Sequence, residues 1–133
     1  MQTFHSYAVI CFSISIGIYK ERFDTMYSLI FYVPKTHLES VKMALFEKGA
    51  GRYDKYDCCA WQVKGEGQYR PQEGSKPFLG QEGNIEKVNE YKVEMICKDS
   101  DIVTVLEELI KAHPYEEPAY IVSEIKTVDD FRK

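Results

Sequence analysis

The stretch YSLIFYVPKTHLESVKMALFEKGAG, residues 27–51, holds a strand pattern followed directly by a helix pattern. An apolar and aromatic run ends at Pro34, which is typical of a buried strand. Thr36 and Glu39 predict a capping box, and apolar residues at helical spacing follow until Gly49 and Gly51 supply a stop signal. The stretch therefore predicts one strand and one helix that packs against it.

Two further strands and a long loop are predicted after these glycines. DCCAWQV (57–63) and EYKVEMI (90–96) alternate in the period of a half-buried strand. Cys58 and Cys59 are then expected to point to opposite faces, as small core or interface residues. Residues 64–87 between the strands carry five glycines and two prolines, a composition of turns. A hairpin loop of this length indicates function or assembly.

The last helix and strand complete the pattern. Ser100 is expected to cap a helix that His113 and Pro114 end, and AYIVSEI (119–125) is the final strand. The order predicts an α+β fold, a ferredoxin-like βαββαβ sandwich with both helices on one sheet face. The other face, with Tyr, Trp, Cys and Ile available to line it, is expected to pack on another subunit. Large apolar patches are seldom left to water.

Length and composition predict one domain. The chain has 133 residues, 44% of them hydrophobic, so it can bury a core of its own. We expect a domain over residues 27–126, an extension over 1–26 and a tail over 127–133. The extension alternates in a way that predicts an added edge strand, and the alternative is that Met26 is the natural start.

Charge and cysteine content limit the classes of binding partner and the cellular compartment that we expect for the protein. A net charge of -4 with interspersed signs leaves no basic stripe for nucleic acid. The apolar run 8–18 is too short to cross a bilayer as a helix and lacks the flanks of an export signal. The four cysteines form neither a C-x-x-C pair nor a disulfide framework. We therefore expect a cytoplasmic protein with no membrane and no nucleic-acid partner.

A family resemblance rests on four motifs in order, spread over residues 27–125: FYVPKTHLESVKMALFEKGAGRYDKYDCCAW, GQYRPQEGSKPFLGQEG, VNEYKVEMI and KAHPYEEPAYIV. Together they resemble the domain inserted in the middle of NGG-interacting-factor-three-like proteins, also called GTP cyclohydrolase type-two homologues. The resemblance implies a fold like that of the trimeric CutA and PII proteins, and HPYEEP is similar to a segment near the carboxyl end of CutA. It implies a free-standing copy of the insert, without the flanking metal-binding domains, so a hydrolase activity is not carried over.

The segment AHPYEEPAY, residues 112–120, holds the first candidate site. His113, Glu116 and Glu117 offer an imidazole and two carboxylates, a set suited to zinc or manganese if a second subunit or the loop completes it. The favoured alternative is structural, with a His113 cation at the helix end and glutamates that are solvated or pair with Arg70 or lysines. The other members would shape the turn and the core edge: Pro114, Tyr115, Pro118 and Tyr120.

The glycine-rich loop holds the second candidate site. Its glycines and the guanidinium of Arg70 could cradle an anion, although no phosphate-binding motif is present. The favoured alternative is an arm that docks on a neighbouring subunit through its aromatic residues. The residues assigned to this anion or interface loop are Gly67, Tyr69, Arg70, Pro71, Gly74, Pro77, Phe78 and Gly80.

The function that these features favour is a non-enzymatic, oligomeric binding or regulatory module of the CutA and PII type. A small molecule or divalent metal would bind at subunit clefts built by the loop and the HPYEEP turn, and the expected homo-oligomer is a trimer. One alternative is a metal-dependent hydrolase with His113 and Glu117 as ligands and Glu116 as general base. Another is a structural docking partner of a second protein. No catalytic residue and no certain cofactor follows from the sequence.

Overall fold

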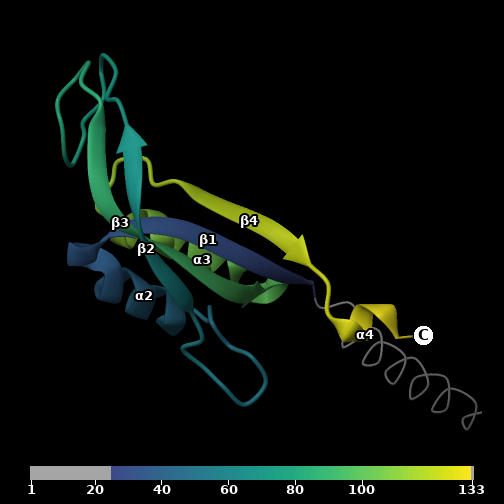
Figure 1. The fold of residues 1–133 in the computed structure, drawn as a ribbon. Coiled ribbons are helices and arrows are strands. Elements are labelled where there is room, and N and C mark those ends of the chain that lie inside the picture. Colours follow the sequence, from purple (N-terminus) through teal and green to yellow (C-terminus); the bar gives the residue numbers. More distant parts are fainter. Residues whose placement is uncertain (1–24, 133) are drawn as a thin grey trace, which may run out of the picture.

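The computed structural model describes residues 25–132, which form a four-stranded sheet with two long helices (Figure 1). The elements in order are β1 (Met26–Pro34), the 3-10 helix η1 (Lys35–His37), α2 (Leu38–Glu47), β2 (Trp61–Tyr69), β3 (Glu86–Lys98), α3 (Asp99–Ala112), β4 (Tyr120–Ile125) and α4 (Val128–Phe131). The added edge strand predicted for the amino-terminal extension lies outside the described residues.

The sheet has the strand order β2-β3-β1-β4, and every neighbouring pair is antiparallel. Helices α2 and α3 lie side by side on one of its faces (Figure 1). The predicted α+β, ferredoxin-like sandwich is therefore confirmed. None of the helices within residues 25–132 has the length and apolar character needed to cross a bilayer.

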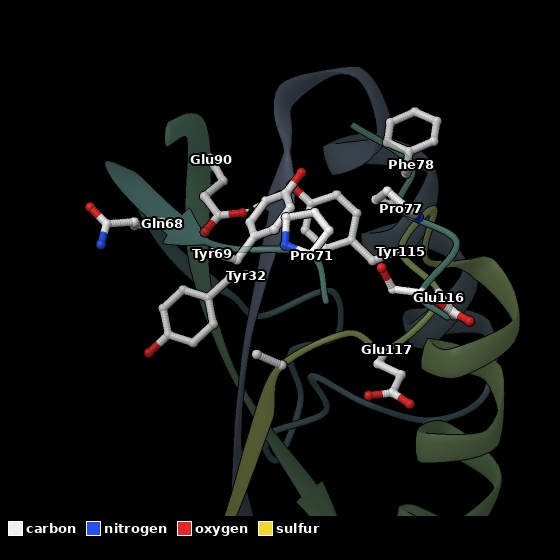
Figure 2. A pocket seen from close by; sticks show the side chains of 12 residues that line it. Tyr32, Gln68, Tyr69, Pro71, Pro77, Phe78, Glu90, Tyr115, Glu116 and Glu117 are labelled. Atoms are coloured by element: carbon white, nitrogen blue, oxygen red, sulfur yellow. Dashed lines mark hydrogen bonds between the residues drawn. The ribbon is translucent and has the colours of Figure 1, made fainter. Parts of the chain in front are cut away.

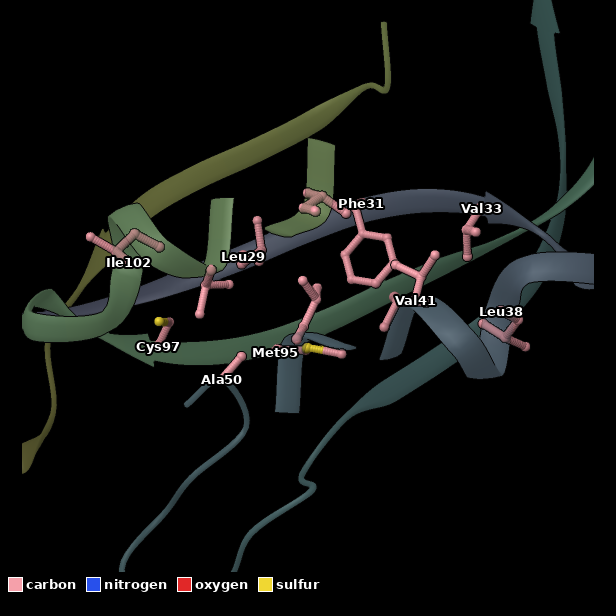
Figure 3. Packing of buried hydrophobic residues seen from close by; sticks show 13 residues of the cluster. Leu29, Phe31, Val33, Leu38, Val41, Ala50, Met95, Cys97 and Ile102 are labelled. Carbon is pink, nitrogen blue, oxygen red and sulfur yellow. The ribbon is translucent and has the colours of Figure 1, made fainter. Parts of the chain in front are cut away.

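The core lies between the sheet and these two helices (Figure 3). Alternate residues of β1 and β3 point toward the helices, because successive side chains of a strand point to opposite faces. The apolar residues of the two helices recur at helical spacing and pack into the same layer. The buried members are Leu29, Phe31, Val33, Leu38, Val41, Leu45, Ala50, Val93, Met95, Cys97, Ile102, Val105 and Leu109.

Among residues 25–132 no helix covers the other face of the sheet, as predicted, and its side chains are partly apolar. Ile30 lies opposite Ile121 on one side and Glu94 on the other. Trp61 also lies opposite Glu94, and the side chains of Trp61 and Ile121 are 59% and 49% exposed. An ion pair between Lys92 Nζ and Glu94 Oε1, 3.2 Å apart, crosses the middle of this face.

Both predicted helix caps are wrong. Thr36 lies in the 3-10 turn before α2, where its Oγ1 is 2.8 Å from His37 Nδ1, and the residue preceding α2 makes no side-chain cap bond. Helix α3 begins at Asp99, one residue before Ser100, because β3 runs directly into it. The predicted helix stop is confirmed: Gly49 has a φ of 110°, a conformation that glycine adopts without strain.

The strand predicted for residues 57–63 begins later in the structure than expected. Strand β2 starts only at Trp61, and the preceding segment turns instead, with Cys58 in the left-handed region at a φ of 53°. The prediction that Cys58 and Cys59 alternate across a sheet is therefore wrong. At its other end β2 continues to Tyr69, so that Gly65 and Gly67 are strand residues and the loop is shortened to residues 70–85.

Candidate functional site

A pocket of about 260 Å³ lies where the long hairpin meets the turn after α3 (Figure 2). Beyond the pair Pro34–Glu90, β3 has no β1 partner and pairs only with β2, as far as Tyr69 opposite Glu86. We call residues 66–89 the arm and residues 113–118 the HPYEEP turn. The pocket is lined by Tyr32, Gln68, Tyr69, Pro71, Ser75, Pro77, Phe78, Glu90, Tyr115, Glu116, Glu117 and Ala119.

His113 anchors the HPYEEP turn to the sheet. Its side chain is buried, its Nε2 is 2.6 Å from the carbonyl oxygen of Tyr32, and its Nδ1 is 3.1 Å from the backbone nitrogen of Tyr115. Since the N–H of Tyr115 must donate to Nδ1, the ring is the neutral tautomer that donates from Nε2 to Tyr32. Burial lowers the pKa of His113 more than the Tyr32 carbonyl raises it. The predicted His113 cation at the helix end is therefore wrong.

Tyr115 joins the turn to the aromatic wall of the pocket. Its hydroxyl donates to Glu90 Oε2 at 3.1 Å, and its ring centroid is 6.1 Å from that of Tyr69 and 6.2 Å from that of Phe78. Burial, and then the nearby Glu90 carboxylate, raises the pKa of Tyr115 far above its usual range. The phenol is therefore a neutral donor at any ordinary pH.

One bond connects the arm to the HPYEEP turn, and a second folds the loop of the arm back onto its own strand. Glu116 Oε2 accepts a hydrogen bond of 2.9 Å from the backbone N–H of Lys76, and the Tyr69 hydroxyl donates to the carbonyl of Leu79 at 2.6 Å. The first bond connects segments 40 residues apart in sequence. The predicted loop site and the predicted HPYEEP site are thus two walls of one pocket.

The three glutamates of the pocket differ in their partners. Glu90 and Glu116 each accept a bond, whereas within residues 25–132 Glu117 accepts none and pairs with no cation. Figure 2 shows the Glu117 carboxylate pointing away from Glu116 and from the two central tyrosine rings. Of the three, Glu117 is the carboxylate left for a ligand.

The residues do not fit the metal site considered from the sequence. Both ring nitrogens of His113 are used in hydrogen bonds, so the imidazole offers no free lone pair to a metal. No group of three His, Cys, Asp or Glu side chains in the described part of the chain is placed to hold an ion. The lining also carries three carboxylates and no Lys or Arg, which does not fit an anion.

Some predicted residues do not line the pocket. Gly67, Arg70, Gly74 and Gly80 are absent from its wall, and Tyr120 lies beyond it, opposite Phe31 in the sheet. Gly67 has a different role, because a Cβ there would collide with the carboxylate of Glu90. Pro114 and Pro118 follow α3 and precede β4, as expected of turn residues.

Sequence reasoning missed five lining residues: Tyr32, Gln68, Ser75, Glu90 and Ala119. The alternation of β1 contains a signal for Tyr32, because the residues beside it, Phe31 and Val33, belong to the helix-covered face. For Glu90 the sequence holds no comparable signal, since its neighbour Tyr115 is 25 residues away.

Comparison with known protein sequences relates the chain to one group of proteins. No protein-family model matches the chain. The "GTP cyclohydrolase 1 type 2 homolog" of Halalkalibacterium halodurans is 42% identical over 97 residues, which are 73% of this chain and 26% of that protein. The chain therefore spans about a quarter of the length of the curated relatives it matches.

Solved structures give the same relationship and add a fold. A Bacillus cereus protein related to NIF3 matches with a TM-score of 0.68 and 36% identity, over 78% of this chain and 26% of that one. The divalent ion tolerance protein CutA1 of Ehrlichia chaffeensis matches with a TM-score of 0.58 and 16% identity, over 79% and 85% of the two chains, which shows a shared fold. The chain is therefore a relative of the NIF3-related GTP cyclohydrolase 1 type 2 homologues over a stretch with a CutA-like fold that makes up about a quarter of their length.

Proposed function

We propose that this domain is a non-enzymatic binding or regulatory module that takes a small ligand in the pocket between the arm and the HPYEEP turn, and that works as a homo-oligomer. The observation that carries the proposal is that two segments distant in sequence close around one pocket lined by aromatic rings. Pockets of this kind, mostly apolar with a few polar groups, are the usual sites of small-molecule binding. The CutA-like fold of the domain is consistent with this role.

The binding part of the proposal is tested with a small-molecule fragment library followed by NMR. Fragments that bind should shift the backbone signals of Lys76 and Tyr115, which lie on opposite walls. Phe78→Ala removes part of one wall and should reduce these shifts, while Phe131→Ala, on the exposed tail helix, should not. If no fragment shifts either signal, the ligand site is refuted.

The open face of the sheet supports the oligomeric part of the proposal. Trp61, Val63 and Ile121 all project from it and are at least 43% exposed. An apolar surface of this kind is typical of an interface. A trimer, with the pocket near the subunit clefts, is the arrangement that the CutA-like fold favours.

A matched pair of substitutions tests the interface. Ile121 on the open face and Ile110 on α3 are 49% and 50% exposed, so replacing either with Glu removes a similar amount of exposed apolar surface and adds the same charge. Light scattering on the intact chain should give a trimer mass for the native protein and for Ile110→Glu, but a smaller mass for Ile121→Glu. A monomer in the native protein at micromolar concentration would refute the oligomer and leave the open face for a different protein.

We also place the module in the cytoplasm. The three cysteines in the described part of the chain are free thiols, which supports a reducing compartment.

A further inference from the structure

We infer that the ligand of this pocket is an organic ammonium ion, a positively charged amine with an apolar body. The inference rests on the proposed binding function and names the chemical class of its ligand. Three features of the lining carry it: the sign of its charge, its aromatic walls, and the one carboxylate that has no partner among residues 25–132.

The charge of the lining has one sign. Glu90, Glu116 and Glu117 contribute three carboxylates, and none of the other nine lining residues is Lys, Arg or His. The negative potential of this lining attracts a cationic ligand and repels an anionic one. The raised pKa values of Tyr69 and Tyr115, caused by burial and then by nearby glutamates, agree with a negative potential around the two phenols.

The aromatic walls suit a cation with a diffuse charge. Tyr69, Phe78 and Tyr115 form a cluster with ring centroids about 6 Å apart, and Tyr32 adds a fourth ring to the lining. The faces of such rings carry partial negative charge and attract alkylated ammonium groups, which cost less to remove from water than a small metal ion does. Pro71 and Pro77 add apolar surface for the body of the ligand.

The three glutamates differ in their hydrogen-bond partners, and this difference favours an ammonium ion over a bare metal ion as the ligand. Glu90 is held by Tyr115 and Glu116 by the backbone of Lys76, so each shapes the wall that it belongs to. Glu117 remains as the carboxylate without a partner among residues 25–132, and it must rotate from the orientation in Figure 2 to contact a ligand held against the tyrosine rings. One carboxylate within reach of the rings is sufficient for an ammonium ion, whereas a divalent metal requires several oxygen or nitrogen ligands.

Three probes of nearly the same shape test the sign of the charge on the intact chain. Choline is the cation, 3,3-dimethylbutan-1-ol its uncharged counterpart and 3,3-dimethylbutanoate an anion. The NMR signals of Lys76 and Tyr115 report binding. We expect choline to bind about tenfold more tightly than the alcohol, and the anion to bind least.

Substitution of the free carboxylate gives the second measurement. Glu117→Gln keeps the size of the side chain, removes its charge, and should weaken choline binding about fivefold while leaving the alcohol unchanged. Glu73→Gln removes a charge from the same loop but outside the lining, and should change neither.

The outcomes separate this inference from the function on which it rests. Equal binding of choline and the alcohol, or tighter binding of the anion, overturns the ammonium ligand and leaves the pocket as a binding site. Choline binding that Glu117→Gln does not weaken overturns the role of Glu117. If none of the three probes binds, the ammonium inference fails, and the fragment experiment decides separately whether the pocket binds anything.

Discussion

The helix-covered core and the pocket beside the arm both contain aromatic rings, but they use them differently. Phe31 is fully buried within a cluster of apolar side chains. Phe78 is 47% exposed, and the half-buried Tyr115 donates its hydroxyl to a carboxylate. A core ring contributes the burial of its whole surface, while a pocket ring leaves a face for a ligand. Substitutions in the core should therefore mainly change stability, and substitutions in the pocket mainly change binding.

The largest effect is expected from Phe31→Ala. Removing a fully buried ring leaves a cavity between the sheet and the helices, which should lower the free energy of unfolding by about 3 to 5 kcal/mol. Urea unfolding followed by circular dichroism measures the change. Phe131→Ala removes the same ring from the exposed tail helix and should have little effect. Similar losses in the two variants would remove the distinction between buried and exposed rings.

The next effect is a dependence of stability on pH that comes from His113. Because burial lowers the pKa of His113 in the folded state, the unfolded chain binds more protons below the ordinary histidine value of about 6.5. Stability should therefore fall as the pH drops from about 6.5 to the folded-state pKa, by up to about 1.4 kcal/mol per pH unit.

His113→Gln isolates this contribution. The Gln amide can still donate to Tyr32 and accept from Tyr115, but it does not titrate. Urea midpoints measured between pH 7.5 and 5 should fall less steeply in the variant than in the native protein. Equal slopes would mean that the histidine is not buried in its neutral form.

A smaller effect is expected in the pocket from Tyr115→Phe. The change removes the donor to Glu90 and keeps the ring, so the free energy of unfolding should fall by about 1 kcal/mol. Tyr56→Phe, on an exposed loop, is the control and should leave stability unchanged. A loss as large as that of Phe31→Ala would show that Tyr115 belongs to the core and not to an adaptable wall.

The smallest effects distinguish two glycines of the same strand. Gly65→Ala meets open space in β2 and should stabilise the protein by about 0.5 to 1 kcal/mol, because alanine loses less backbone freedom on folding. Gly67→Ala should lose this gain, because its Cβ would force the Glu90 carboxylate away from Tyr115. Thermal unfolding of both variants measures the difference. Equal melting temperatures would show that Glu90 is not confined by the arm.

Much of the fold followed from local patterns, since the spacing of apolar residues indicates which face of a strand or helix is buried. Phe31 and Val93 were predictable in this way. The helix starts were not, because tertiary contacts replaced the local caps: Asp99 is held by bonds to Thr25 and Tyr27 instead of following a capping side chain. The start of β2 was missed because Cys58 turns the chain with a positive φ value, which is uncommon for a cysteine.

The pocket was predictable only in part. Its two segments could be recognised by composition, and both were singled out as candidate sites. A cleft built by both segments was expected between subunits. The bonds that bring the segments together within one chain, between Glu116 and Lys76 and between Tyr115 and Glu90, could not be predicted, because these residues are distant in sequence. The role of His113 was also hidden, since its neutral state follows from burial against the carbonyl of Tyr32.

The pairing of the arm has a consequence for its motion. Residues 86–89 of β3 pair only with β2, whereas residues 90–94 have partner strands on both sides and residues 95–98 pair with the central strand β1. The arm can therefore separate locally while the central sheet and the core remain folded. Amide hydrogen exchange along this one strand should accelerate toward its amino-terminal end, with the step near Glu90. A bound ligand that bridges the arm and the HPYEEP turn would slow exchange on the arm side of that step.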